Sequence, residues 1–209
     1  MALASTGSGE QLSALCFDAR PSIVGCILKN PHASLEQARL IAAHHASATG
    51  LGMLFMRAEF MRDPEVQRRL WKNPQLNDAQ IRQLTATKRL LDVWKLSVGH
   101  EVTEKSKHAL MRELRTKFSS APAEERVELI FKTEGRCLMG LSGVPADGRT
   151  TALLCARTYS SMLLVQNISH WAAAPPALIA HLLKQPMVMR QSQLMRKLQA
   201  HPNAPHRPH

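Results

Sequence analysis

Histidine is the residue type of this chain best suited to hold a metal ion, provided that several histidines are suitably spaced. His44 and His45 are adjacent near the expected end of a helix, where an imidazolium ring interacts favourably with the helix dipole. A metal site there would need at least one further ligand close in space. His201, His206 and His209 are spaced for chelation, but ordering their proline-rich tail would cost conformational entropy. We therefore expect capping or surface roles for these histidines and no metal site.

No local pattern of residues indicates catalysis. The chain has no Gly-rich phosphate loop, no Gly-x-Ser-x-Gly sequence and no His-Glu-x-x-His sequence. Its four cysteines contain no Cys-x-x-Cys pair, so neither a zinc site nor a disulfide framework is indicated, and we expect small buried thiols: Cys16, Cys26, Cys137 and Cys155. We assign no catalytic residue, no cofactor and no small-molecule substrate. A catalytic site assembled from distant positions leaves no local trace, so an enzyme stays open as an alternative.

Basic side chains form the more informative pattern. The formal net charge is +11, and residues 151–209 contain six Lys or Arg and no Asp or Glu. Such a positive field suits phosphates, acidic protein surfaces or anionic lipid, although it also serves solubility. A second basic cluster lies in residues 57–90, which hold eight Lys or Arg against four acids. The candidate binding residues are Arg62, Arg68, Arg69, Arg157, Lys184, Arg190, Arg196 and Lys197.

An internal repeat indicates the elements that position these residues. The segment Pro-Ser-Ile-Val-Gly-Cys-Ile-Leu-Lys-Asn-Pro at 21–31 returns 43 residues later, at 64–74, as Pro-Glu-Val-Gln-Arg-Arg-Leu-Trp-Lys-Asn-Pro. A period of this length is typical of solenoids built from helical units, each of which buries its apolar face against the next. With only nine aromatic residues and many Leu, Ala and Met, the chain is predicted to be all-α.

Each copy predicts two helices separated by an Asn-Pro break. A helix begins at the first proline, buries Ile23 and Ile27 in one copy and Val66 and Leu70 in the other, and stops before the second proline. Asparagine is interpreted here as a helix terminator.

The next helix of each copy opens with a capping box. Ser34 with Gln37 starts a helix expected from Leu35 to about Ala48, and Asn77 with Gln80 starts its counterpart. Gly50 and Gly52 are then expected to mark a turn.

Further helices are expected at 53–61, 90–98, 105–118, 124–132 and 152–164, followed by a basic amphipathic helix over 187–200. Residues 1–19 are expected to be a flexible lead-in, 20–203 a single helical domain and 204–209 a disordered tail.

The N-terminus lacks the basic start and apolar run of a secretory signal, and no stretch reaches the length needed to span a bilayer. We therefore expect a soluble, cytoplasmic protein.

The repeated units resemble the HEAT-like and variant leucine-rich helical repeats of bacteria, in which antiparallel helix pairs stack into a right-handed superhelix. The resemblance covers residues 20–85 and, more weakly, 160–205. The segment 115–135 resembles one that recurs in bacterial proteins of this kind without an assigned role. The resemblance implies a right-handed α-solenoid that acts as a non-catalytic adaptor and binds a partner through its curved face. It transfers no catalytic residue.

Some HEAT-like proteins are DNA glycosylases that hold an alkylated base with Trp, Asp and Arg side chains. The corresponding residue types here are Trp71, Trp94 and Trp171 with Asp92 and Arg157, although the glycosylase motifs do not align with this chain. Trp71 and Trp94 fall on apolar helix faces and are expected to be buried, whereas Trp171 is expected to be the most exposed of the three.

The sequence therefore predicts a helical-repeat scaffold that binds another protein through its curved face and its basic C-terminal surface. The alternative is a nucleic-acid-binding repeat protein, with the glycosylase as its catalytic form. Attachment of the last helix to an anionic membrane surface is a third, less favoured possibility.

Overall fold

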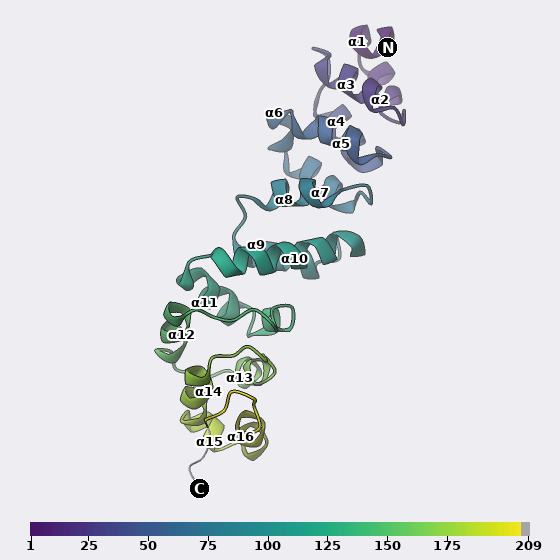
Figure 1. The fold of residues 1–209 in the computed structure, drawn as a ribbon. Helices are drawn as coiled ribbons and strands as arrows, with labels where there is room; N and C mark the ends of the chain where they lie inside the picture. The colour runs from purple at the N-terminus through teal and green to yellow at the C-terminus, as the bar shows by residue number, and fades with distance from the viewer. Residues whose placement is uncertain (206–209) are drawn as a thin grey trace. The chain divides into compact units, whose positions relative to one another are not determined.

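The computed structural model of the chain describes residues 1–205, which fold entirely into helices, turns and loops without a strand (Figure 1). The all-α prediction is confirmed. None of the helices in this range combines the length and the apolar character that crossing a bilayer requires.

Two units of the chain each have their own set of contacts. Unit 1 comprises Met1–Thr87 and Lys95–Leu110, and unit 2 comprises Lys88–Trp94 and the chain from Met111 onward. The sequence predicts one domain over 20–203.

Eight helices lie wholly within unit 1: α1 (Ala2–Thr6), α2 (Glu10–Leu15), α3 (Pro21–Lys29), α4 (Leu35–His44), α5 (Ala48–Phe55), α6 (Ala58–Met61), α7 (Pro64–Lys72) and α8 (Asp78–Thr85). The boundary between the units falls inside α9 (Leu90–Val98) and α10 (Glu104–Ser120). Unit 2 continues with α11 (Ala123–Lys132), a 3-10 helix η1 (Arg136–Met139), α12 (Gly148–Cys155), α13 (Met162–Ser169), α14 (Pro176–Leu183), α15 (Pro186–Met189) and α16 (Ser192–Gln199).

The two proline-started helices of the repeat are present at the predicted residues. α3 and α7 both begin at proline, whose fixed φ suits a first helical position. Ile23, Ile27, Val66 and Leu70 are all buried, as predicted from the helical period. Within unit 1, α3 packs against α5, and α4 packs against α7.

Both predicted capping boxes are formed. In each box the N-cap side chain accepts a hydrogen bond from a backbone N–H of the first turn. The glutamine at the third helical position accepts a hydrogen bond from the backbone N–H of the N-cap residue. Ser34 donates to Gln37 Oε1 at 2.9 Å, and Asn77 donates to Gln80 Oε1 at 3.1 Å. Each glutamine also donates a hydrogen bond from its Nε2 to a segment nearer the N-terminus. Gln37 donates to Ser13 Oγ at 2.8 Å, and Gln80 donates to the Ala48 carbonyl at 2.7 Å.

The asparagines of the Asn-Pro breaks do more than end a helix. Asn30 is buried and donates both Nδ2 hydrogens to α1, at 3.1 Å to the Ala4 carbonyl and 2.9 Å to the Gly7 carbonyl. Asn73, also buried, donates in the same way to α4, at 3.0 Å to the carbonyl of Ala42 and 3.1 Å to that of His45. The two acceptors are in both cases the C-cap residue of the earlier helix and the residue three before it.

The acceptor oxygen of each asparagine is also satisfied. Asn30 Oδ1 accepts from the backbone N–H of His32 at 2.8 Å, and Asn73 Oδ1 accepts from that of Gln75 at 2.9 Å. One buried amide thus fixes its own turn and satisfies the carbonyls that a helix end leaves without intrahelical partners. We call this arrangement the asparagine clamp.

The N-terminal segment 1–19 is helical where the sequence analysis expected a flexible lead-in. Its helices α1 and α2 bury Ala4 and Leu12, and Cys16 is buried directly after α2. The carbonyls that the Asn30 clamp needs come from this segment.

The predicted turn at Gly50 and Gly52 is wrong, because both residues lie inside α5. α4 ends at His44 rather than near Ala48, and Ser47 then caps α5 by accepting a bond from the Gly50 N–H at 3.1 Å. The buried ring of His45 lies against Gly50, where a Cβ atom would come 1.7 Å from His45 Nε2. Glycine is therefore required here for close approach and not for chain reversal.

Two predicted C-terminal helices are interrupted. The expected helix 152–164 is broken between α12 and α13, where the hydroxyl of buried Tyr159 donates to the Leu154 carbonyl at 3.0 Å. The expected basic helix 187–200 consists of α15 and α16. Gln191 is the exposed N-cap of α16. Of the expected tail, residues 206–209 lie outside the described part of the chain.

We expect Asn73→Ala to destabilise the protein by about 2–3 kcal/mol, because it leaves buried carbonyls of α4 and the Gln75 N–H without partners. Urea unfolding followed by circular dichroism measures the change. Gln75→Ala is the matched control, since that side chain is exposed in the same turn. Equal stability of the two variants would contradict a structural role for the clamp.

The buried His45 predicts a dependence of stability on pH. Burial lowers the pKa of His45 below its ordinary value of 6.5, with the nearby Asp18 charge acting in the opposite direction. The unfolded chain then takes up the proton first, so the free energy of unfolding should fall as the pH drops below about 6.5. His45→Gln should flatten this dependence in urea titrations at a series of pH values, whereas His32→Gln, at an exposed position, should retain it. An unchanged slope in His45→Gln would contradict the assignment.

Candidate binding surface

The eight basic residues singled out in the sequence fall into two groups. Arg62, Arg68 and Arg69 belong to unit 1, whereas the remaining five belong to unit 2. The groups differ in whether acidic side chains already engage them.

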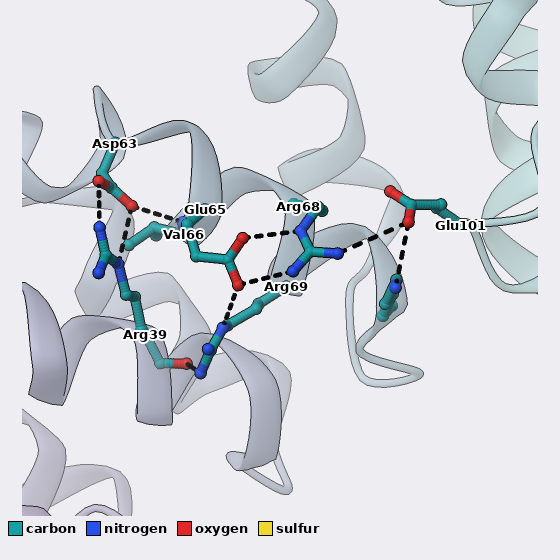
Figure 2. A network of polar contacts seen from close by, with 8 residues as sticks. Arg39, Asp63, Glu65, Val66, Arg68, Arg69 and Glu101 are labelled. Carbon is teal, nitrogen blue, oxygen red and sulfur yellow. Dashed lines mark hydrogen bonds and ion pairs between the residues drawn. The ribbon is translucent and has the colours of Figure 1, made fainter.

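Arg68 and Arg69 are held by one carboxylate of their own helix (Figure 2). Glu65 lies in the first turn of α7 and accepts from Arg68 Nε at 2.7 Å and from Arg69 Nε at 2.7 Å. The two hydrogen bonds, that of Arg68 first, lower the pKa of Glu65 to about 2. Beyond this helix, Glu101 lies 3.6 Å from Arg68 Nη1 and 3.3 Å from Lys72 Nζ.

The same network joins α7 to α4. Asp63 is the N-cap of α7, where it accepts from the Val66 N–H at 2.9 Å. Its carboxylate also accepts a bidentate pair from Arg39 of α4, at 3.2 Å to Nε and 2.8 Å to Nη2. The bond from Arg39 and the bond from the Val66 N–H lower the pKa of Asp63. Arg69 Nη1 lies 3.5 Å from the Arg39 carbonyl.

Arg68 and Arg69 therefore form ion pairs within the protein. Their charges are matched by Glu65 and Glu101, so they present less positive field than the sequence count indicates. Arg62 differs from them, because it is exposed at the end of α6 and no carboxylate of residues 1–205 pairs with it.

The five candidates of unit 2 are all exposed and stand at the ends of helices. Lys184 and Arg190 are the C-cap residues of α14 and α15, Arg196 and Lys197 lie in the last turn of α16, and Arg157 follows the C-cap of α12. Positive charge at a helix C-terminus interacts favourably with the helix dipole. None of the five pairs with a carboxylate within residues 1–205. The helices α14, α15 and α16 pack against one another, so four of the five residues come from a set of mutually contacting elements.

Arg157 has one aromatic neighbour. Its guanidinium lies 5.5 Å from the centroid of the Phe131 ring, within cation–π range. The side chain nevertheless remains exposed.

The tryptophans are placed differently from the expectation. Trp171 was predicted to be the most exposed of the three but is fully buried, so that prediction is wrong. The C-terminal turn lies on it: His201 Nε2 lies 3.0 Å from the Trp171 carbonyl, and Asn203 donates to the Ala172 and Ala174 carbonyls. Trp71 is buried as expected, and Trp94 is half-buried.

Histidines and cysteines form no evident reactive cluster in the described range. His44 is exposed with its ring 5.2 Å from that of Phe17, His201 is buried, and His206 and His209 lie beyond the described residues. Across residues 1–205, no three His, Cys, Asp or Glu side chains gather in a group that could hold a metal ion.

The thiols differ in burial. Cys16 and Cys137 are buried as expected, and burial raises the pKa of each to about 12, which makes them poor nucleophiles. Cys26 and Cys155 are half-buried.

Two features were missed by sequence reasoning. Arg126 is a buried cation whose Nη1 lies 3.1 Å from Asp147 Oδ2 and whose Nη2 donates to the Ser119 carbonyl at 2.8 Å. The other is an apolar groove beside α3. Neither has a local motif, because both depend on which segments the fold brings together.

Glu65→Gln should weaken the protein through loss of its two arginine contacts. A carboxyl whose folded pKa lies near 2, below the ordinary 4.5, contributes stability above about pH 4.5 and loses it as the pH falls toward 2. The stability difference between the wild type and Glu65→Gln should therefore be present at neutral pH and vanish in acid. Added salt should reduce it, because the carboxylate is partly exposed. Urea titrations at neutral and acidic pH measure it, and a difference that persists at pH 2 would contradict this electrostatic role.

Comparison with models of protein families, with curated proteins and with solved structures finds no match to this chain.

Proposed function

We propose that the chain is a non-catalytic helical-repeat scaffold that binds an acidic protein partner through its basic C-terminal surface. We define this surface as Arg157, Lys184, Arg190, Arg196 and Lys197. The observation that carries the proposal is that all five are exposed and unpaired with any carboxylate of residues 1–205, in a sequence stretch without a single acid.

A HEAT-like α-solenoid is the architecture we propose for the scaffold. It is supported by the 43-residue recurrence of proline-started helix, asparagine clamp and capping box. The Asn30 and Asn73 side chains donate to equivalent carbonyls at the end of an earlier helix, α1 and α4 respectively. Stacking of successive repeats requires that each copy contacts the helices that precede it, and the two asparagine side chains make such contacts.

The burial of two of the three tryptophans favours a protein partner over nucleic acid. Single-stranded or flipped bases are held by stacking on exposed aromatic side chains. Trp71 and Trp171 are both buried and cannot provide such a platform in this conformation. Two of the three tryptophans named for the glycosylase alternative therefore cannot stack on a base.

Site-specific photocrosslinking tests the proposal. A photoreactive phenylalanine analogue replaces Gln193, which is exposed in α16 near Arg196 and Lys197, in cells of the source organism. We expect a crosslinked adduct that is sensitive to protease and resistant to nuclease. The triple substitution Arg190→Glu, Arg196→Glu and Lys197→Glu should abolish the adduct while leaving the circular dichroism spectrum unchanged, because the three side chains are exposed.

The control position is Gln83, which is exposed on α8 of unit 1. Equal adducts at the two positions would reject a specific surface. A nuclease-sensitive adduct would favour the nucleic-acid alternative, as would DNA binding whose logarithm falls with log salt at about −0.9 per neutralised phosphate.

A further inference from the structure

An apolar groove of 450 Å³ lies between α3 and the C-terminal end of α5 in unit 1. Its apolar lining comes from Gly25, Cys26, Leu28, Met53 and Met56. All of these residues belong to the same unit, so the groove is defined by contacts within that unit.

Gly25 keeps the groove open. It is an interior residue of α3, where glycine is less favourable for helix formation than alanine. A Cβ atom at this position would lie 3.0 Å from Met53 Sδ, so any larger side chain would enter the space beside Met53.

The repeat shows that this groove is particular to the first copy. The positions 43 residues after Gly25 and Cys26 are occupied by Arg68 and Arg69, whose side chains are engaged by Glu65. Two small residues in one copy thus replace two long, paired cations in the other.

Two flexible methionine side chains, Met53 and Met56, line the groove. Met56 is 75% exposed, which is unusual for a large apolar side chain, and Met53 is half-buried. Unbranched thioether side chains adjust to the shape of a partner and recur on surfaces that bind amphipathic helices.

The charges that line the groove are both positive. They are Lys29, at the exposed end of α3, and Arg57, which follows α5. Arg57 Nε donates to Glu59 at 2.7 Å, and Arg62 lies close enough to add to the field at that carboxylate. Lys29 and Arg57 are therefore the charged residues of the lining, and no carboxylate lines the groove.

We propose that this groove binds an amphipathic helical segment of a partner protein, with its apolar residues seated between Leu28, Met53 and Met56 and with Asp or Glu facing Lys29. The inference rests on the proposed function in so far as the ligand is a protein, but it uses a second surface in the other unit. Two helices that flank an apolar trough match the helix-in-groove mode of recognition, and the positive rim selects acidic flanks.

The test uses a displayed library of random peptides selected on the full-length protein. We expect enriched peptides with apolar residues at i, i+3, i+4 and i+7 and with Asp or Glu between them. Fluorescence anisotropy with a labelled synthetic copy of an enriched peptide then measures affinity. Gly25→Leu, which fills the groove, should weaken binding at least about tenfold, equivalent to about 1.4 kcal/mol. Thermal unfolding checks that this variant is folded.

Exposed positions supply a second pair of variants that leaves folding intact. Met56→Gln should weaken binding of the same peptide, whereas Met139→Gln, at an 86% exposed methionine of unit 2, should not. Bound peptide should also slow alkylation of the Cys26 thiol, measured by peptide mass spectrometry, without slowing that of Cys155.

The outcomes separate this proposal from the proposed function. The triple charge reversal at Arg190, Arg196 and Lys197 should leave peptide binding unchanged while it removes the photocrosslink at Gln193. Enrichment of no peptide family, enrichment of basic peptides, or equal affinity for the wild type and Gly25→Leu would overturn the groove proposal. Protection of Cys26 by vesicles of anionic phospholipid but by no peptide would overturn it in favour of a membrane ligand.

Discussion

The asparagine clamp is the interaction on which the rest of unit 1 depends. A short helix leaves its last carbonyls without intrahelical partners, and a chain of short helices must satisfy such groups at every junction. Asn30 and Asn73 do so from a distance in sequence, by donating both amide hydrogens to the end of an earlier helix. The proline that follows holds the turn, and the capping box starts the next helix. The buried carbonyls at these helix ends therefore have hydrogen-bond partners within the apolar core.

The basic side chains of the two units differ in whether acidic side chains pair with them. Asp63, the N-cap of α7, holds Arg39, and Glu65 in its first turn holds Arg68 and Arg69 (Figure 2). In unit 2 the acid-free stretch leaves its cations at helix ends without such partners. Binding of an acidic protein is our proposal for the second group, and an amphipathic helix is our proposal for the groove that Gly25 leaves open. Electrostatic complementarity of this kind supplies specificity and rapid association more than affinity, so an apolar groove is a useful complement.

Local rules explain what could be predicted from the sequence. Proline at a helix start, Ser34 with Gln37, Asn77 with Gln80, and the spacing of Ile23 and Ile27 each act over one or two turns, and each was found as expected. Two of the failures concern contacts between distant segments: Trp171 is covered by a turn 30 residues later, and the groove exists because Gly25 faces Met53. The turn predicted at Gly50 was wrong for a local reason, because Ser47 caps a helix that contains Gly50. The sequence pattern identified Asn30 as a terminator, but it could not supply the carbonyls that its side chain reaches.

Hydrogen exchange of the asparagine side chains tests the central claim most directly. In a protein labelled with nitrogen-15, the Nδ2 hydrogens of Asn30 and Asn73 can be followed by NMR after transfer to deuterated water. The clamp predicts that they exchange as slowly as the backbone amides of α3 and α7, because both are buried and doubly bonded to carbonyls. Exchange as fast as that of the exposed Gln75 side chain would contradict the account.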